Sequence, residues 1–438
     1  MNVSSVIKSC IVFYLAITLL APLAVPINTD RVTGEYTLPP PLSVNMSFET
    51  TMFRRMSIRE FTEDSVTDEE LSTILWAAYG KREDGTLTVP TINGSYAAVL
   101  YVLKEDAAYT YNSENHSLIY YKEGDWRDIV GHQYHAPIQL GLCWNTDIAD
   151  KASGATQLGA IGQNIQFMAN ALNVGTVVTG EFPPAIEPLG LPENEEGMIV
   201  MPLGHPKYTY TFEYKPRVLS LLPAIQESVF TLSSVLELRN ETETFQGELT
   251  LQEETQLLWS CYGYSYYLDR SKNTIGRLDR HRTVPSAHGY YPLTFYFIKE
   301  TGIYRYFPNI YNPIYGFTKL LRNRWNLPII SFNLKIGNED VRDEIATAAA
   351  NPALSSSPLI ILATLDDRKA NRWDDLSGEF SRHLWLYEAG ASAQNCLLEA
   401  TALGLQGNIV FPQDVDSISS LLKLGRECYP LLLIPIST

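Results

Sequence analysis

One loop in the second half of the 438-residue sequence, RTVPSAHGYYP, has residue types suited to holding a flat polar ring or an anion. It brings backbone N–H groups and a small hydroxyl close together. The residues concerned are Pro285, Ser286, Ala287 and Gly289. The alternating apolar run LTFYFI follows the loop and predicts a strand. An ordinary turn before a strand has a similar composition, so the loop gains weight only from the rest of the chain.

A second segment, RRMSIREF, lies more than half the chain away and carries Arg55, Ser57 and Arg59 at alternate positions. Two guanidinium groups and a hydroxyl at this spacing can form charge-assisted, bidentate hydrogen bonds to a phosphate. The alternative is a solvated basic turn ahead of a helix. A helix is predicted to follow, because Thr67 and Glu70 form a capping box.

The two segments belong to a repeated pattern. Five segments of the first half resemble five of the second half in the same order, among them TDEELSTILWAAYGKR with TLQEETQLLWSCYGYS and GAIGQNIQFMANALNV with GASAQNCLLEATALGL. This order predicts a tandem duplication, with a boundary near residues 218–232 and an insertion in the second copy around residues 308–350. We expect the two copies to pack as a homodimer fused into one chain, and therefore a monomer.

Together with GTVVTGEF and PLGHP in the first half, these motifs resemble the nitroreductase-like flavoprotein family, and most closely its thiazole/oxazole-forming dehydrogenase branch. The resemblance implies an α+β fold, with a central, mostly antiparallel sheet flanked by helices in each of two domains, and FMN at their interface. The expected divisions are a leader or anchor at 1–26, a Pro-rich arm at 27–50, domain 1 at 51–217, a linker at 218–232 and domain 2 at 233–438.

The resemblance also implies FMN-binding roles in both domains. In domain 1 the R-x-S-x-R segment meets the phosphate and ribityl chain, a turn after GTVVTGEF follows the isoalloxazine ring, and a basic residue returns to the phosphate. These residues are Arg55, Ser57, Arg59, Gly180, Glu181 and Arg217, with Lys215 as a second match for the last. In domain 2 the loop residues Pro285, Ser286, Ala287 and Gly289 face the ring.

Four further residues of domain 2 have two interpretations each. His288 and Tyr290 lie in the ring-facing loop and could touch substrate or donate a proton, but Tyr290 could instead only pack the interface. Gln394 and Asn395 could contact the flavin or tie backbone across the interface.

The two copies differ at their flavin motifs. Counting back from the matched helix, domain 2 has Leu238, Asn240 and Thr242 where domain 1 has R-x-S-x-R. Domain 1 has PTINGSYA where domain 2 has PSAHGYYP. Domain 1 thus keeps the phosphate half of a site and domain 2 keeps the ring-facing half, so we expect one FMN per chain, held between the domains.

The activity that the resemblance implies is an FMN-dependent oxidoreductase that passes hydride through N5 of the flavin to or from a small-molecule or peptide substrate. Azoline oxidation is one option, but the catalytic Lys-Tyr pair of that branch has no match here. The electron donor and acceptor stay open. The alternative is a non-catalytic binding or scaffold protein that keeps a degenerate flavoprotein fold.

Charge and the N-terminus bear on partners and location. A net charge of −16 without a basic stripe argues against nucleic-acid binding. Lys8 followed by the apolar run at 10–25 has the shape of a signal peptide or an uncleaved membrane anchor, so we expect an extracytoplasmic protein. The cysteines outside this run have no CxxC spacing, which argues against a metal site and leaves disulfides or buried thiols. They are Cys143, Cys261, Cys396 and Cys428.

The segment DKASGAT, residues 150–156, resembles the sequence on which flavin transferases esterify FMN to a threonine, here Thr156. The alternative is an N-cap formed by Ser153 or Thr156 for a helix that runs from Gly159. Both interpretations depend on where that helix begins.

Overall fold

The computed structural model describes residues 34–131, 134–179, 186–210, 212–213, 218–265, 267–268, 281–308, 329–370 and 379–438. Residues 35–438 form one compact unit. Its described part holds two seven-stranded sheets and a ribbon of β8 (Phe212–Glu213) with β10 (Tyr267–Leu268).

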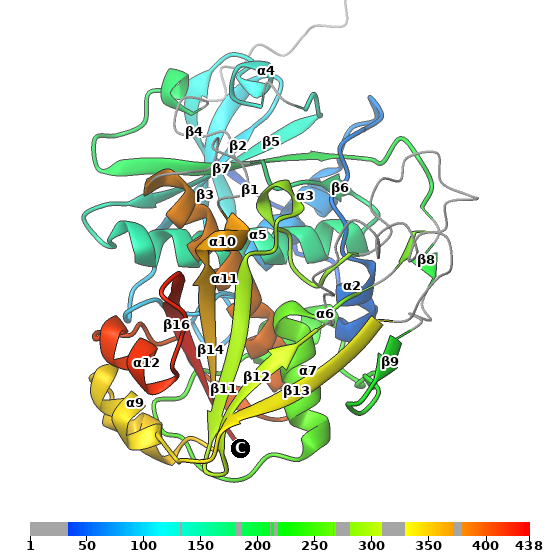
Figure 1. Ribbon diagram of the computed structural model, residues 1–438. Coiled ribbons are helices and arrows are strands. Elements are labelled where there is room, and N and C mark those ends of the chain that lie inside the picture. Colours follow the sequence, from blue (N-terminus) through cyan, green and yellow to red (C-terminus); the bar gives the residue numbers. More distant parts are fainter. Residues whose placement is uncertain are drawn as a thin grey trace, which may run out of the picture. The chain divides into compact units, whose positions relative to one another are not determined.

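The two sheets have the same strand order, which confirms the expected α+β fold in two copies (Figure 1). The first runs β1-β4-β3-β2-β5-β7-β6 and the second, in the matching sense, β9-β13-β12-β11-β14-β16-β15. All neighbouring strands within them are antiparallel except β13 with β9. The first sheet comprises β1 (Glu35–Thr37), β2 (Ala98–Leu103), β3 (Ala107–Asn112), β4 (Ser117–Glu123), β5 (Ile138–Asn145), β6 (Gly175–Thr176) and β7 (Glu195–Gly204). The second comprises β9 (Val218–Ser220), β11 (Leu293–Lys299), β12 (Gly302–Phe307), β13 (Ile329–Gly337), β14 (Leu359–Asp366), β15 (Gln406–Gly407) and β16 (Cys428–Ser437).

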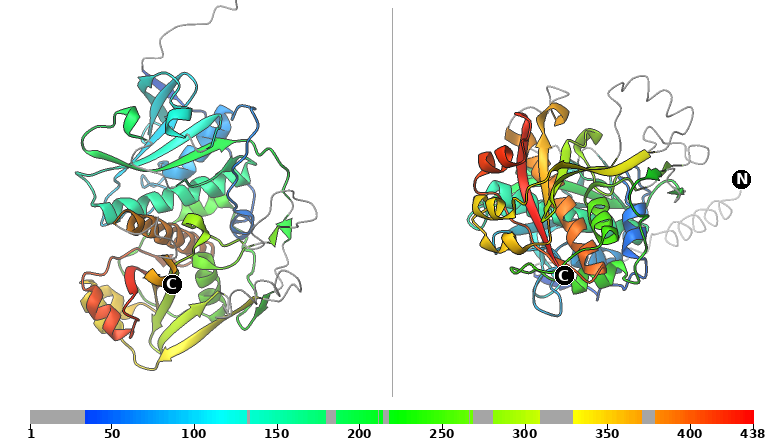
Figure 2. Two further views of the ribbon diagram at one scale, coloured as in Figure 1. Left: turned by 45° about the horizontal axis from the view of Figure 1, so that its top comes forward. Right: turned by 60° about the horizontal axis from the view of Figure 1, so that its bottom comes forward.

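Two long helices, α5 (Lys151–Ala171) and α11 (Glu379–Ala402), lie side by side between the two sheets (Figure 2). Against them pack α3 (Asp68–Tyr79) on α5 and α7 (Leu251–Tyr262) on α11. Both α3 and α7 begin with a capping box, as predicted for the first, so their starts are fixed locally. The other α-helices are α2 (Phe48–Arg54), α4 (Arg127–Val130), α6 (Leu232–Leu238), α9 (Arg342–Ala348), α10 (Asp367–Ala370) and α12 (Val415–Leu421).

Glycine is required at two equivalent points where α5 and α11 meet. A Cβ atom on Gly159 would lie 2.1 Å from the carbonyl oxygen of Tyr387, and one on Gly390 would lie 2.0 Å from that of Thr156. The two glycines, like the two residues they face, are 231 positions apart (390 − 159 and 387 − 156). The contact is therefore unchanged when the two copies exchange roles, as expected of a fused homodimer.

A second reciprocal contact joins the segments before α2 and α6. The N–H of Phe48 donates to the carbonyl of Phe230 at 3.1 Å, and the N–H of Leu232 donates to that of Met46 at 2.9 Å. Each donor is the first residue of its helix, so each copy satisfies an otherwise open N–H group of the other.

Several expected boundaries move. The helix predicted from Gly159 begins at Lys151, and its N-cap is Asp150, whose carboxylate accepts the N–H of Ser153 at 2.7 Å. The predicted linker contains β9, which pairs with β13. Part of the predicted insertion is β13 and α9, which match β4 and α4, so the added length lies between β12 and β13.

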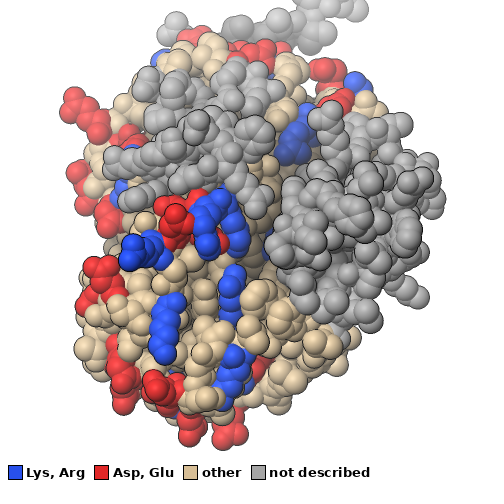
Figure 3. All heavy atoms as spheres, viewed as in Figure 1, with Lys and Arg blue, Asp and Glu red and all other residues tan. Residues whose placement is uncertain are grey.

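All four cysteines of the compact unit are buried free thiols, which decides between the two interpretations of their apolar surroundings. Among the described helices, none has both the length and the apolar character needed to cross a bilayer. The expected leader at 1–26 lies outside the described residues. On the face shown in Figure 3, basic and acidic side chains are interspersed over the second sheet.

The close contact between α5 and α11 predicts that Gly159→Ala is destabilising. A glycine-to-alanine change inside a helix normally stabilises by up to about 1 kcal/mol, but here the methyl group meets a backbone oxygen that cannot move alone. We expect the free energy of unfolding to fall by about 2 kcal/mol or more, measured by denaturant titration. Gly390→Ala should behave alike, whereas Glu344→Ala on the exposed side of α9 should stay within about 0.5 kcal/mol. A more stable Gly159→Ala variant would contradict the packing.

Candidate functional site

The loop before β11 has a sharply bent backbone. His288, Gly289 and Tyr291 have φ values of 51°, 69° and 50°, a region that non-glycine residues rarely adopt. The hydroxyl of Ser286 accepts the N–H of Tyr291 at 2.9 Å and closes the bend. The bend leaves His288 exposed, with its ring stacked on that of half-buried Tyr290 at a centroid distance of 5.5 Å.

Arg55 joins domain 1 to this loop. It ends α2, is 2% exposed, and donates from Nε and Nη2 to the carbonyl of Arg282 at 3.2 and 3.1 Å. Its Nη1 donates to Gln166 at 2.8 Å. Ser57 is half-buried and Arg59 is exposed, with one contact to the carbonyl of Ser57. The guanidinium of Arg55 thus braces the loop across the domain interface.

Arg239 is the counterpart of Arg55, which corrects the match of domain 2 to Leu238, Asn240 and Thr242. Arg239 ends α6 as Arg55 ends α2. It donates to the carbonyl of Leu87 at 3.0 Å, the position in the domain 1 loop that corresponds to Arg282. The connection from α6 to α7 has 12 residues (239–250) against 13 (55–67) from α2 to α3, so counting back from α7 gave a register wrong by one.

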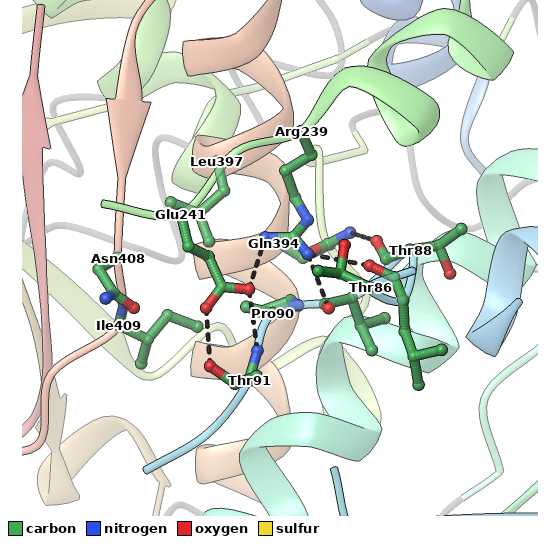
Figure 4. A network of polar contacts seen from close by, with 12 residues as sticks. Thr86, Thr88, Pro90, Thr91, Arg239, Glu241, Gln394, Leu397, Asn408 and Ile409 are labelled. Carbon is green, nitrogen blue, oxygen red and sulfur yellow. Dashed lines mark hydrogen bonds and ion pairs between the residues drawn. The ribbon is translucent and has the colours of Figure 1, made fainter. Parts of the chain in front are cut away.

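In the corrected register Glu241 stands where domain 1 has Ser57, and its carboxylate occupies the domain 1 loop (Figure 4). It accepts the N–H and the hydroxyl of Thr91 at 3.0 and 2.7 Å, and Arg239 donates to it at 3.0 Å. Thr91 is the counterpart of Ser286. We call the region of Arg239, Glu241 and the domain 1 loop the second site, and its counterpart around Arg55, Ser57 and the domain 2 loop the first site. In the second site a protein carboxylate therefore already binds the loop groups that a ligand would need.

A cleft of about 550 Å³ opens beside Glu241. It lies between the domain 1 loop and domain 2, and two of the side chains that line it are carboxylates. The lining residues are Thr91, Asn93, Gly94, Glu241, Glu243, Ala349, Ala350, Asn351, Asn408, Ile409, Val410, Phe411 and Gln413. At its Glu241 position the first site has only the hydroxyl of Ser57, which brings no charge to the loop.

The buried amides on α5 and α11 tie backbone within and across the two domains. Asn395 donates to the carbonyls of Ser260 and Thr283 at 3.0 and 3.2 Å within domain 2, and Gln394 crosses to the carbonyl of Thr88 at 3.2 Å. Their counterparts repeat the pattern: Asn164 donates to Ala77 and Thr88 within domain 1, and Gln163 crosses to Thr283 at 2.9 Å.

A charged cluster lies behind the ring-facing loop. Arg282 is enclosed by the rings of Tyr262, Tyr264 and Tyr291, with its guanidinium carbon 4.5, 4.7 and 4.8 Å from their centroids. Glu388, from α11, is 1% exposed and accepts the hydroxyl of Tyr262 at 2.5 Å. Burial raises the pKa of Glu388 to about 7, and Ser286, Tyr262 and Arg282 limit the rise.

Some predicted site residues cannot be placed, and one is excluded as an attachment point. Gly180, Glu181, Arg217 and Lys215 lie outside the described residues. Thr156 is fully buried in the second turn of α5 and donates to the carbonyl of Ala152 at 2.9 Å. Neither a flavin ester nor an N-cap is compatible with that position.

Sequence reasoning missed four residues of this region. Arg239 and Glu241 could have been found by matching the two helix ends instead of counting along the loop. Arg282 was visible at the start of the loop motif but has leucine as its counterpart. Glu388 precedes the matched helix motif, and no local pattern marks it as buried.

The Nitroreductase family model matches residues 52–205 and 255–436. A candidate nitroreductase of Methanocaldococcus jannaschii is 30% identical in an alignment of 162 residues that covers 31% of this chain and 80% of that protein. The NADPH-flavin oxidoreductase of Vibrio harveyi is 26% identical in an alignment of 231 residues that covers 50% of this chain and 89% of that protein. The crystal structure of a candidate nitroreductase from Anabaena variabilis has the same fold, with a TM-score of 0.62 at 14% identity over 88% of this chain and 94% of that one.

The raised pKa of Glu388 predicts how stability changes with pH. Folding moves this pKa from its ordinary 4.5 to about 7, so the group's stabilising contribution is complete below pH 4.5 and is lost as pH rises through 7. Glu388→Gln cannot ionise. Above pH 7 its free energy of unfolding should therefore exceed that of the wild type by up to about 3 kcal/mol, and near pH 4.5 the two free energies should differ little. Thermal melts across this range measure the gap.

The comparison of variant with wild type removes the contributions of Glu49 and Glu399, whose pKa values burial also raises. Glu344→Gln on the surface is the control and should show no pH-dependent gap. A constant gap from pH 4.5 to 8 would show that Glu388 does not titrate in this range.

Proposed function

The chain belongs to the nitroreductase family of oxidoreductases, and on this premise we propose that it binds one FMN per chain in a composite site. The site joins Ser57 and Arg59 of domain 1 to the loop of Ser286 in domain 2. The observation that carries the proposal is the difference between the two pseudo-symmetric sites. Glu241 fills the loop of one with its own carboxylate, and Ser57 stands at the same place in the other. The flavin named in the Vibrio harveyi relative supports the choice of cofactor.

The donors of this site suit a flavin phosphate and ring. Arg59 is exposed and offers a guanidinium, and the segment that leads into the Ser286 loop is held against domain 1 by Arg55. Gly180, Glu181 and Arg217 complete the proposed set. Arg55, the other arginine of the R-x-S-x-R segment, donates to Arg282 and Gln166 and so also holds the loop. We assign it the positioning of the loop.

Bound FMN would supply hydride transfer, and the protein residues position and select the substrate. His288, exposed at the bend and stacked on Tyr290, is the residue we assign to substrate contact. Tyr290 packs toward Trp385 at 6.5 Å between centroids and supports His288 from behind. The substrate class that we propose is a small molecule or a peptide, oxidised or reduced at the flavin.

Two broader proposals accompany this one. The reciprocal packing of the two domains supports a monomer that provides both halves of its own interface. The apolar N-terminal run supports an extracytoplasmic location, where nicotinamide cofactors are scarce and a membrane carrier or partner protein would have to exchange electrons. The rival function is a non-catalytic scaffold, and a colourless purified protein that takes up no FMN would establish it.

Flavin extraction from the purified protein should give about one FMN per chain. Arg59→Ala should weaken FMN binding by roughly ten- to a hundred-fold, the effect of losing one charge-assisted contact worth about 1.5–3 kcal/mol. Glu243→Ala is the matched control, since Glu243 lines the other site. Two FMN per chain, or full flavin content in the Arg55→Ala, Arg59→Ala double variant, would overturn the composite site.

Transplanting the carboxylate should close the site. Ser57→Glu places at the first site the residue that occupies the second, and we expect FMN binding to weaken roughly a hundred-fold or more from charge repulsion and occupied loop donors. Ser57→Gln has the same size without the charge and should weaken binding less. Fluorescence titration of the apoprotein with FMN measures both. Equal affinity of Ser57→Glu and wild type would place the cofactor elsewhere.

A further inference from the structure

The domain 2 loop and its counterpart in domain 1 each lie next to a buried polar residue of a long helix. The two residues occupy corresponding positions of α5 and α11 but differ in type. In domain 1 this residue is Gln157 on α5, and in domain 2 it is Glu388 on α11, 231 positions later (388 − 157). Gln157 makes neutral contacts only. Its oxygen accepts the N–H groups of Ala97 and Ala98 at 2.7 and 3.0 Å, and its nitrogen donates to the carbonyl of Ser95 at 3.1 Å.

Three linked differences surround Glu388. Pro292 stands where domain 1 has Ala97, so one N–H donor is missing there. The N–H of Leu293 donates to the hydroxyl of Tyr262 at 3.2 Å, as that of its counterpart Ala98 does to Tyr79, but the Tyr262 hydroxyl also donates on to Glu388. Arg282 stands where domain 1 has Leu87. An amide with backbone partners is thus replaced by a carboxylate and an arginine at the same place in the fold.

The hydroxyl of Tyr262 occupies only one carboxylate oxygen of Glu388, Oε1. Its Oε2 is buried and makes no hydrogen bond that meets standard geometry, while the Ser286 hydroxyl lies near enough to lower the carboxyl pKa. Ser286 is the loop residue that closes the bend and the counterpart of Thr91, which binds Glu241 in the other site. Glu388 is therefore linked to the end of the loop through Tyr262 and Leu293, and Ser286 is the loop residue whose hydroxyl influences its carboxylate.

The net charge of the Arg282–Glu388 pair depends on one proton. Arg282 stays protonated across the physiological range, so the pair carries +1 when Glu388 is protonated and zero when it is ionised. The other polar or charged groups that influence Glu388 come from α7, the loop and α10. They are Tyr262, Ser286 and Lys369.

We propose that Glu388 is a positioning residue of the proposed flavin site, acting together with Arg282 and Ser286. Protonation of Glu388 raises the affinity of the loop for an anionic flavin. This inference rests on the proposed function. Protonated Glu388 leaves the positive charge of Arg282 unopposed behind the loop, which attracts the phosphate and the reduced ring. Ionised Glu388 cancels that charge. Binding of FMN should then be coupled to uptake of a proton.

The test is the dissociation constant of FMN measured on the full-length protein from pH 6 to 8.5. The wild type should lose affinity as pH rises through 7, by roughly three- to ten-fold. Glu388→Gln, which carries no charge at this position at any pH and copies Gln157, should lack this loss, so that it matches the wild type near pH 6 and binds FMN more tightly than the wild type above pH 7. Titration of the FMN phosphate itself affects both proteins alike, so the difference between the two curves reports Glu388.

Two controls separate positioning from general effects of burial. Glu399→Gln removes another buried carboxyl of α11, one bound to Gln256 at 2.6 Å, and should leave the pH dependence of the wild type intact. Glu388→Asp keeps a titratable group and should keep a pH dependence with a shifted midpoint.

Parallel curves for wild type and Glu388→Gln, with FMN bound to both, would overturn the role of Glu388 and leave the composite site standing. No FMN binding by the wild type at any pH would instead overturn the proposed function on which the role rests. If Glu388→Gln does not melt cooperatively, Glu388→Asp is used in its place. An FMN dissociation constant that changes with pH around the same midpoint in Glu388→Asp as in the wild type would then count against the proposal.

Discussion

The close contact of α5 with α11 is the constraint on which the rest of the structure depends. Two glycines let the helices approach so closely that a backbone carbonyl of each helix lies where a Cβ atom on the glycine of the other would be. Buried amides from the same helices then hold backbone carbonyls of both domains. Because each crossing amide ends on the segment leading to a loop, the helix contact also fixes where each loop sits relative to the opposite domain. The placement of both loops follows from this one packing arrangement.

Within this shared frame, the two sites differ by a few charges. At the second site Arg239 and Glu241 neutralise each other against the domain 1 loop, which is an internal substitute for a bound anion. At the first site the acid is absent, and an arginine and a carboxyl group lie behind the loop instead. The backbone arrangement is the same, so the chemistry of each site is set by side chains at Ser57 and Gln157 and their counterparts.

The sequence was sufficient to predict the fold, because it is specified by strong periodic patterns that occur twice. The capping box at Thr67, the strand at LTFYFI and the paired helices could all be predicted from the sequence. The register of Arg239 was not, because a single deletion in a loop leaves no local mark. The roles of Arg55 and Gln394 were also uncertain, because hydrogen-bond partners more than a hundred residues away are a property of packing alone.

The covalent link between the domains has a consequence for how this protein can vary. In a true homodimer one gene encodes both faces of the interface, so an acid in place of Ser57 would enter both sites at once. Here each face is inherited separately, and Glu241 can exist without imposing itself on the first site. After fusion the two copies of the sequence can therefore differ although their folds stay the same. One site can be lost or take on a new function while the other is kept.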